Sequence, residues 1–163
     1  MRPARFESLL ADAARHIPVV DGVKTLADAG HTEHPFGVVT HLTDGAQVWW
    51  SFTAMGRPGD SYREEEAPPV SGPHPEVAEV PAAPTGSIPM AYLEAALAAA
   101  LLDVDHNSEI KGVTRFSEGE GSIPFGLTVD FHDGAKAFVN SLAAVRSGQS
   151  SPSGRWYEVP ATV

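Results

Sequence analysis

The densest group of potentially reactive side chains in this chain of 163 residues is a short stretch that carries His31, Glu33 and His34. Two imidazoles and a carboxylate are ligand types that transition metals accept, and imidazoles exchange protons near neutral pH. The stretch has the composition of a loop, with no obvious third imidazole beside it. We therefore expect no metal ion and no cofactor, and we interpret most of the seven histidines as ordinary surface residues.

Acidic residues suggest two further kinds of site. Asp44 and Asp133 both stand before glycine and could form a catalytic pair, but aspartate is favoured in tight turns for its local hydrogen bonds. Residues 103–109 place oxygen atoms at alternate positions, as a calcium loop does. That loop needs glycine where this chain has Ser108 and glutamate where it has Thr114. We interpret the aspartates as turn residues and residues 103–109 as the end of a helix.

No motif with a known catalytic mechanism stands out. The chain has no cysteine, which excludes disulfides, thiolate zinc sites and cysteine nucleophiles. It has no glycine-rich phosphate loop and no Gly-x-Ser-x-Gly elbow. An active site assembled from distant loops would leave no such motif. The sequence thus favours a protein without catalysis and identifies no catalytic residue.

The charge balance limits the classes of partner. The formal net charge is -10, with only 11 lysines and arginines, which opposes binding to a phosphate backbone. The longest apolar run, residues 95–102, is much shorter than a membrane span, and the first residues lack the apolar core of a signal peptide. We expect no nucleic acid, no membrane and a cytoplasmic location.

A sequence repeat indicates the architecture. Residues 35–46 recur as residues 124–135 at a constant offset of 89, and Pro, Phe, Gly, Asp, Gly and Ala coincide. The match continues without gaps to Gly59 and Gly148. This pattern predicts an internal duplication.

Each copy contains the same predicted elements. An apolar stripe at helical spacing precedes each copy, a β-prone stretch follows (residues 23–26 and 110–116), and the repeated hairpin comes next. Each unit is therefore α-β-β-β, and the predicted fold is α+β, an antiparallel sheet with two helices packed on one face. The helical stripes consist of Phe6, Leu9, Leu10, Ala13 and Ile17 in the first unit and Met90, Leu93, Leu97 and Leu101 in the second.

The segment between the two copies has a different composition. Half of the 14 prolines, together with three consecutive glutamates, lie between residues 57 and 87. Proline fixes φ and lacks an amide donor, so an extended linker is expected. The predicted division is a first repeat over residues 1–60, a linker over 61–87 and a second repeat over 88–163. A final strand is predicted at residues 156–159.

The Asp-Gly dipeptides favour two-residue type I′ turns, which determine the register of each hairpin. In the first hairpin this register predicts a core face that contains Trp49. Another turn type would shift the pairing by one residue and undo this assignment. The predicted opposite face is apolar as well and carries Val39, His41, Val48, Trp50 and Phe52.

An apolar face of this size needs a cover or a partner. The linker, a second copy of the chain and a different partner or ligand all remain candidates. We therefore interpret that face as a binding surface and expect a protein partner or a homodimer. The leading hypothesis is a non-catalytic protein-binding or assembly module. The alternative is an enzyme or a small-molecule or metal-binding protein with a pocket between the repeats, which would use His31, Glu33, His34 and His132.

Overall fold

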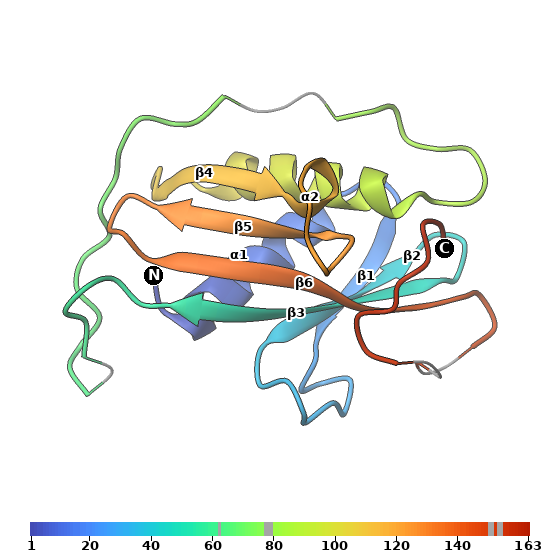
Figure 1. Ribbon diagram of the computed structural model, residues 1–163, viewed down its shortest axis with the longest axis horizontal. Helices are drawn as coiled ribbons and strands as arrows, with labels where there is room; N and C mark the ends of the chain where they lie inside the picture. The colour runs from blue at the N-terminus through green and yellow to red at the C-terminus, as the bar shows by residue number, and fades with distance from the viewer. Residues whose placement is uncertain (62, 77–79, 150–151, 153–154) are drawn as a thin grey trace.

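The computed structural model describes residues 1–61, 63–76, 80–149, 152 and 155–163, which form two α-helices and one six-stranded antiparallel sheet (Figure 1). Both helices lie behind the sheet in Figure 1, so its outer face is turned to the viewer. In chain order the elements are α1 (Pro3–Arg15), β1 (Val20–Thr25), β2 (Gly37–Leu42), β3 (Gln47–Met55), α2 (Met90–Val104), β4 (Ile110–Arg115), the 3₁₀ turn η1 (Phe116–Glu118), β5 (Gly126–Phe131) and β6 (Lys136–Val145).

The strand order β1-β2-β3-β6-β5-β4 places the hairpin strand that ends each half at the centre of the sheet. There β3 and β6 pair antiparallel, so the two halves share one continuous sheet. This arrangement confirms the predicted α+β fold with both helices on one face. Each half has the order α-β-β-β, whereas the shared ancestry of the halves stays a prediction from the sequence.

One apolar core lies between the helices and the sheet. Phe6 of α1 is completely buried and contacts aromatic rings from both halves, Phe52 of β3 at 4.9 Å and Phe131 of β5 at 5.8 Å between ring centroids. Nearly the whole of α2 is buried, including Leu97 and Leu101. The halves therefore pack as one unit.

The glycine of each Pro-Phe-Gly repeat begins a strand that lies very close to its neighbour. Gly37 has a φ of 148° and Gly126 a φ of 158°. A Cβ atom on Gly37 would lie 2.0 Å from the Trp50 carbonyl oxygen, and one on Gly126 would lie 2.3 Å from that of Val139. Only glycine fits such positions, which explains why this residue recurs.

In each half, a glutamate of the helix accepts a hydrogen bond from the repeated glycine of that half. Glu7 of α1 accepts a hydrogen bond from the Gly37 amide at 2.9 Å, and Glu94 of α2 accepts one from the Gly126 amide at 2.8 Å. Glu94 is completely buried and also accepts from the amide of Phe116. The start of the second strand of each half is thereby attached to the helix behind it.

The register of both hairpins differs by one residue from the predicted one. In the first turn the Gly45 amide donates to Leu42 and the Leu42 amide donates to Ala46, so the loop has three residues. Gly45 has a φ of 87°, whereas Asp44 has no positive φ. The turn is therefore a type I turn followed by a glycine bulge, and type I′ was wrong. Asp44 keeps its expected role, because its Oδ1 accepts from the Ala46 amide.

The shift changes which side chains share a face. Val48 and Trp50 point to the helices and are completely buried, with Phe52 beside them in the same core. Val39 pairs with Trp49 and His41 with Gln47 on the outer face. The five residues predicted to form one binding surface are therefore divided between the two faces of the sheet.

The outer face of the first half is covered by the chain itself. A second buried cluster includes Val39, Trp49 and Leu142, and Trp156 and Tyr157 pack against it. Residues 156–159 form no strand, contrary to expectation; the Tyr157 amide instead donates to the Leu142 carbonyl oxygen of β6. The cover was expected from the linker, a second chain or a partner.

The described part of residues 61–87 contains no helix or strand, and it lies against the rest of the chain at several points. The Gly72 amide donates to the carbonyl oxygen of Ser108, and His74 bonds the carbonyl oxygen of Leu102 at the end of α2. Within the described residues, neither helix combines the length and the apolar character that crossing a bilayer requires.

Candidate functional site

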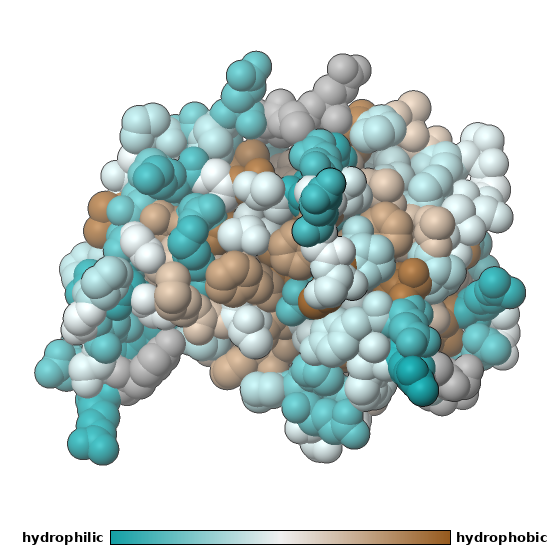
Figure 2. Space-filling view, viewed as in Figure 1, coloured by the Kyte–Doolittle hydropathy of each residue, from teal (hydrophilic) through white to brown (hydrophobic). Residues whose placement is uncertain are grey.

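A groove with a volume of ≈520 Å³ lies on the outer face of the sheet, mostly over its second half. In Figure 2, which shows this face, apolar atoms gather over β5 and β6 with hydrophilic atoms around them. The floor comes from β3 and β6, and one wall comes from the segment that follows β4. The main side chains that line the groove are Thr53, Arg115, Phe116, Ile123, Phe138 and Asn140.

The groove of the second half lies at the position that is covered in the first half. Phe138 stands 89 positions after Trp49, which is the offset of the sequence repeat. Trp49 is only 7% exposed beneath Trp156 and Tyr157, whereas Phe138 is half-buried and lines the groove. The same position of the sheet is therefore covered in one half and accessible in the other.

The groove has a mixed lining, in which Phe138 on the floor lies among polar side chains and an acidic residue stands on one wall. Phe138 lies between Thr53 and Thr128 on the neighbouring strands. Glu120 is exposed on the wall, and Glu118 nearby forms an ion pair with Arg115. The part of the lining that the structure describes has no histidine.

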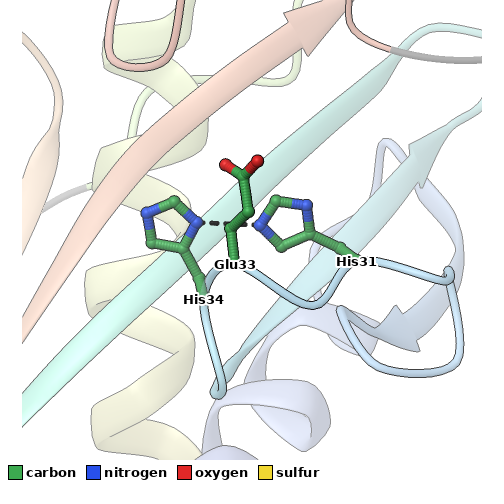
Figure 3. A group of neighbouring side chains, drawn as sticks. All are labelled: His31, Glu33 and His34. Atoms are coloured by element: carbon green, nitrogen blue, oxygen red, sulfur yellow. Dashed lines mark hydrogen bonds between the residues drawn. The ribbon is translucent and has the colours of Figure 1, made fainter.

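A second candidate site lies beside the cover of the first half. His31 Nε2 and His34 Nδ1 are 2.8 Å apart, and the two rings are nearly parallel. Figure 3 shows the rings facing each other across this hydrogen bond, with the carboxylate of Glu33 beside the gap. One ligand atom from each of the three residues lies within 4.8 Å of the others. The loop between β1 and β2 therefore brings together all three residues that the sequence analysis singled out.

Aromatic residues of the C-terminal segment hold this histidine pair. His34 Nε2 lies 3.0 Å from the Tyr157 hydroxyl, and Trp156 Nε1 donates to Glu33 Oε2 at 2.8 Å. Burial lowers the pKa of His34 below its usual 6.5, the charge of His31 lowers it further, and Glu33 acts in the opposite direction. The neutral imidazole is thus favoured at neutral pH.

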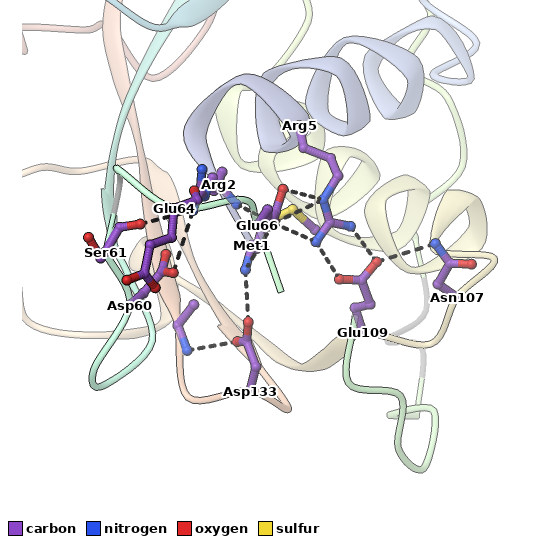
Figure 4. A network of polar contacts seen from close by, with 11 residues as sticks. Met1, Arg2, Arg5, Asp60, Ser61, Glu64, Glu66, Asn107, Glu109 and Asp133 are labelled. Carbon is purple, nitrogen blue, oxygen red and sulfur yellow. Dashed lines mark hydrogen bonds and ion pairs between the residues drawn. The ribbon is translucent and has the colours of Figure 1, made fainter. Parts of the chain in front are cut away.

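A third polar group lies elsewhere, where α1, the linker and the start of β4 meet (Figure 4). Arg5 of α1 donates from Nη1 and Nη2 to the two carboxylate oxygens of Glu109 at 2.6 and 2.8 Å, and to Glu66 at 2.9 Å. The hydrogen bond to Glu109, together with Glu66, raises the pKa of Arg5 above its usual value. These ion pairs hold three segments together, and we interpret the group as structural.

The sequence analysis located part of these sites. It named His31, Glu33 and His34, but it grouped them with His132, which instead lies against the linker at 3.2 Å from the Pro73 carbonyl oxygen. It missed the role of Trp156 and Tyr157 and the accessible position of Phe138. The equivalence of Trp49 and Phe138 in the repeat was the available signal for the groove.

No protein-family model matches the chain, and comparisons with curated proteins and with solved structures give no match either.

Proposed function

We propose that the chain is a non-catalytic protein-binding module whose groove accepts a basic segment of another protein that carries an aromatic side chain. One observation carries the proposal: the equivalent position of the first half is filled by the chain's own Trp156 and Tyr157. Trp156 and Tyr157 lie in a turn, and their rings cover the outer face of the first half. By analogy, the groove around Phe138 suits an aromatic ring of another segment.

Charge argues for a foreign partner. The chain carries a net charge of -10, and Glu120 is exposed at the groove. A second copy would bring the same negative charge, whereas a basic segment would be attracted and steered toward the surface. The proposal therefore includes a basic protein partner in the cytoplasm rather than a homodimer, and no nucleic acid.

An internal duplication forms part of the same proposal, with repeats over residues 1–60 and 88–163 and the linker over 61–87. The recurring bonds of Glu7 to Gly37 and of Glu94 to Gly126 support it. In a duplicated scaffold, one copy can keep its outer face closed for stability while the other copy keeps its outer face open for binding.

The test is a fluorescence-anisotropy titration with short labelled peptides. One peptide has lysines around a central Trp-Tyr pair; a second has serines in place of the aromatic residues; a third has glutamates in place of the lysines. We expect the basic aromatic peptide to bind about tenfold more tightly than either comparison peptide, because both the ring and the charge contribute. Equal binding of all three peptides would contradict the proposal.

Two variants show where the peptide binds. Thr53→Trp fills the groove from an exposed position without a change of charge, and we expect it to weaken binding about tenfold. Thr43→Trp, at an exposed position in the β2–β3 turn, is the matched control and should bind as the unaltered chain does. Unchanged binding by Thr53→Trp would place the peptide elsewhere. Light scattering tests for a homodimer. If the unaltered chain forms a dimer and Thr53→Trp is a monomer, a second copy of the chain occupies the groove, and the proposal of a different protein partner is wrong.

The alternative function, in which the chain binds a metal or a small molecule, has one specific observation in its favour. This observation is the group of His31, Glu33 and His34, whose ligand atoms lie together.

A further inference from the structure

The group of His31, Glu33 and His34 has the dimensions of a small metal site. Its ligand atoms lie within 4.8 Å of one another, and the two facing imidazole nitrogens are 2.8 Å apart. In a tetrahedral zinc site each nitrogen lies roughly 2.05 Å from the metal, so two such nitrogens are about 3.3 Å apart. A small opening of the histidine pair therefore makes room for an ion.

The protonation of the pair is compatible with this exchange. The tautomer of His34 that donates from Nε2 to the Tyr157 hydroxyl leaves Nδ1 with a free lone pair. His31 then donates its Nε2 proton to that nitrogen. When a metal ion takes the place of this proton, water can remove the proton from Nε2 of His31 and supply another to Nδ1 of His31. Both rings stay neutral and each offers one nitrogen.

The surroundings orient the three side chains as the outer shell of a metal site does. The Tyr157 hydroxyl is hydrogen-bonded to Nε2 of His34. Trp156 donates a hydrogen bond to Oε2 of Glu33, which leaves Oε1 of Glu33 for an ion. Outer contacts of this kind fix the ring orientation and the tautomer of metal ligands. The ring of His31 is further held by the edges of Trp49 and Trp156, at 5.8 and 5.1 Å between centroids.

We infer that His31, Glu33 and His34 bind one divalent transition-metal ion of the zinc class, with water at the fourth position. Two imidazoles and one carboxylate select such an ion over magnesium and calcium, which prefer all-oxygen sites. The half-buried imidazoles and the exposed Glu33 leave the group accessible from solvent. The inference does not depend on the groove.

A bound ion would strengthen the cover of the first half. It would join three residues of the β1–β2 loop, and two of them, Glu33 and His34, are hydrogen-bonded to Trp156 and Tyr157 of the C-terminal segment. A ligand that binds only the folded state stabilises it in proportion to the logarithm of its free concentration. Zinc should therefore raise the melting temperature of the full chain, and EDTA should reverse the rise.

Isothermal titration of the EDTA-treated full chain with Zn²⁺ alone tests the site. We expect one ion per chain, with the affinity reduced at least about tenfold in His31→Ala and in His34→Ala, since each loses one of three ligands. His106→Ala removes an exposed histidine outside the group and should bind as the unaltered chain does. Mg²⁺ and Ca²⁺ in excess should not compete.

Tyr157→Phe and Co²⁺ keep the test decisive if the alanine variants fold poorly. Tyr157→Phe preserves the ring but removes the hydroxyl from His34, and loss of an outer contact typically reduces metal affinity by roughly 10-fold or more. Co²⁺ bound to the unaltered chain should give the intense visible absorption of tetrahedral coordination. Absence of saturable Zn²⁺ binding, equal binding by His31→Ala and His106→Ala, or octahedral Co²⁺ spectra would overturn the inference.

Discussion

Glu94 is a buried carboxylate that holds several backbone amides of the second half. It is completely buried, and its Oε1 accepts hydrogen bonds from the amides of Phe116, Ser117 and Gly126. Glu7 accepts a single bond from Gly37 in the first half. A carboxylate bonded to several amides contributes more than one bonded to a single amide, because each donor would otherwise be buried without a partner.

Glu94→Ala is therefore expected to lower the free energy of unfolding by about 3 kcal/mol, and Glu7→Ala by about 1 kcal/mol. Chemical denaturation followed by circular dichroism measures both changes. Equal losses for the two variants would contradict this difference in roles.

Neither glutamate was recognisable from the sequence. A glutamate in a helix usually faces water, and nothing local distinguishes Glu94 from a surface residue. The repeat did show that Gly37 and Gly126 coincide, and the structure gives the reason, a positive φ and a close approach to the neighbouring strand. A bond that joins a helix to a loop more than 20 positions away leaves no local pattern.

At the scale of the elements, the two strands of each hairpin approach so closely that the first residue of the hairpin must be glycine. Gly37→Ala places a Cβ against the backbone oxygen of Trp50, and we expect a loss of at least about 3 kcal/mol in the free energy of unfolding. Gly30 has a φ of 79°, and a Cβ atom added there would meet nothing within 4 Å, so Gly30→Ala tests the backbone conformation alone. It should lose only about 1 kcal/mol. Denaturant titration of both variants would refute the packing argument if the losses were alike.

The order and type of the two helices and six strands were predictable, whereas the register was not, and the strand expected at residues 156–159 does not form. Periodic apolar residues identified both helices, and the repeat identified both hairpins. An Asp-Gly pair occurs in two-residue turns and also in three-residue turns with a glycine bulge, and here only Gly45 takes positive φ. The difference of one residue moved Trp50 into the core and Trp49 to the outer face.

At the scale of the whole molecule, Arg5 joins the two halves through Glu66 of the linker and Glu109 before β4. Burial acts to raise the pKa of Glu66, but the hydrogen bonds and charge of Arg5 outweigh it and hold that pKa below 4.5. A carboxyl whose pKa is lower in the folded state stabilises that state at neutral pH, and this contribution is lost as the pH falls below 4.5.

Glu66→Gln should therefore reduce the dependence of stability on pH below 4.5, while it lowers stability at pH 7. Urea denaturation across this range measures the effect. A variant whose stability falls with acid as steeply as that of the unaltered chain would show that Glu66 makes no such contribution.

The open groove and the covered face could not be predicted from the sequence. Both depend on where Trp156 and Tyr157 return to the sheet, and the backbone bond from Tyr157 to Leu142 has no local signature. The sequence analysis expected an apolar face on the first hairpin that needs a cover, but three of the residues it assigned to that face, Val48, Trp50 and Phe52, lie in the core beneath the helices. It could not tell which half covers itself.

The binding of a basic aromatic peptide, mapped by NMR on the isotope-labelled full chain, tests the central claim most directly. The account predicts that amide shifts change around Phe138, Asn140 and residues 119–123, and that those around Trp156 and Tyr157 stay unchanged. Shifts confined to the region of Trp156, or none at saturating peptide, would contradict a binding module that uses the groove.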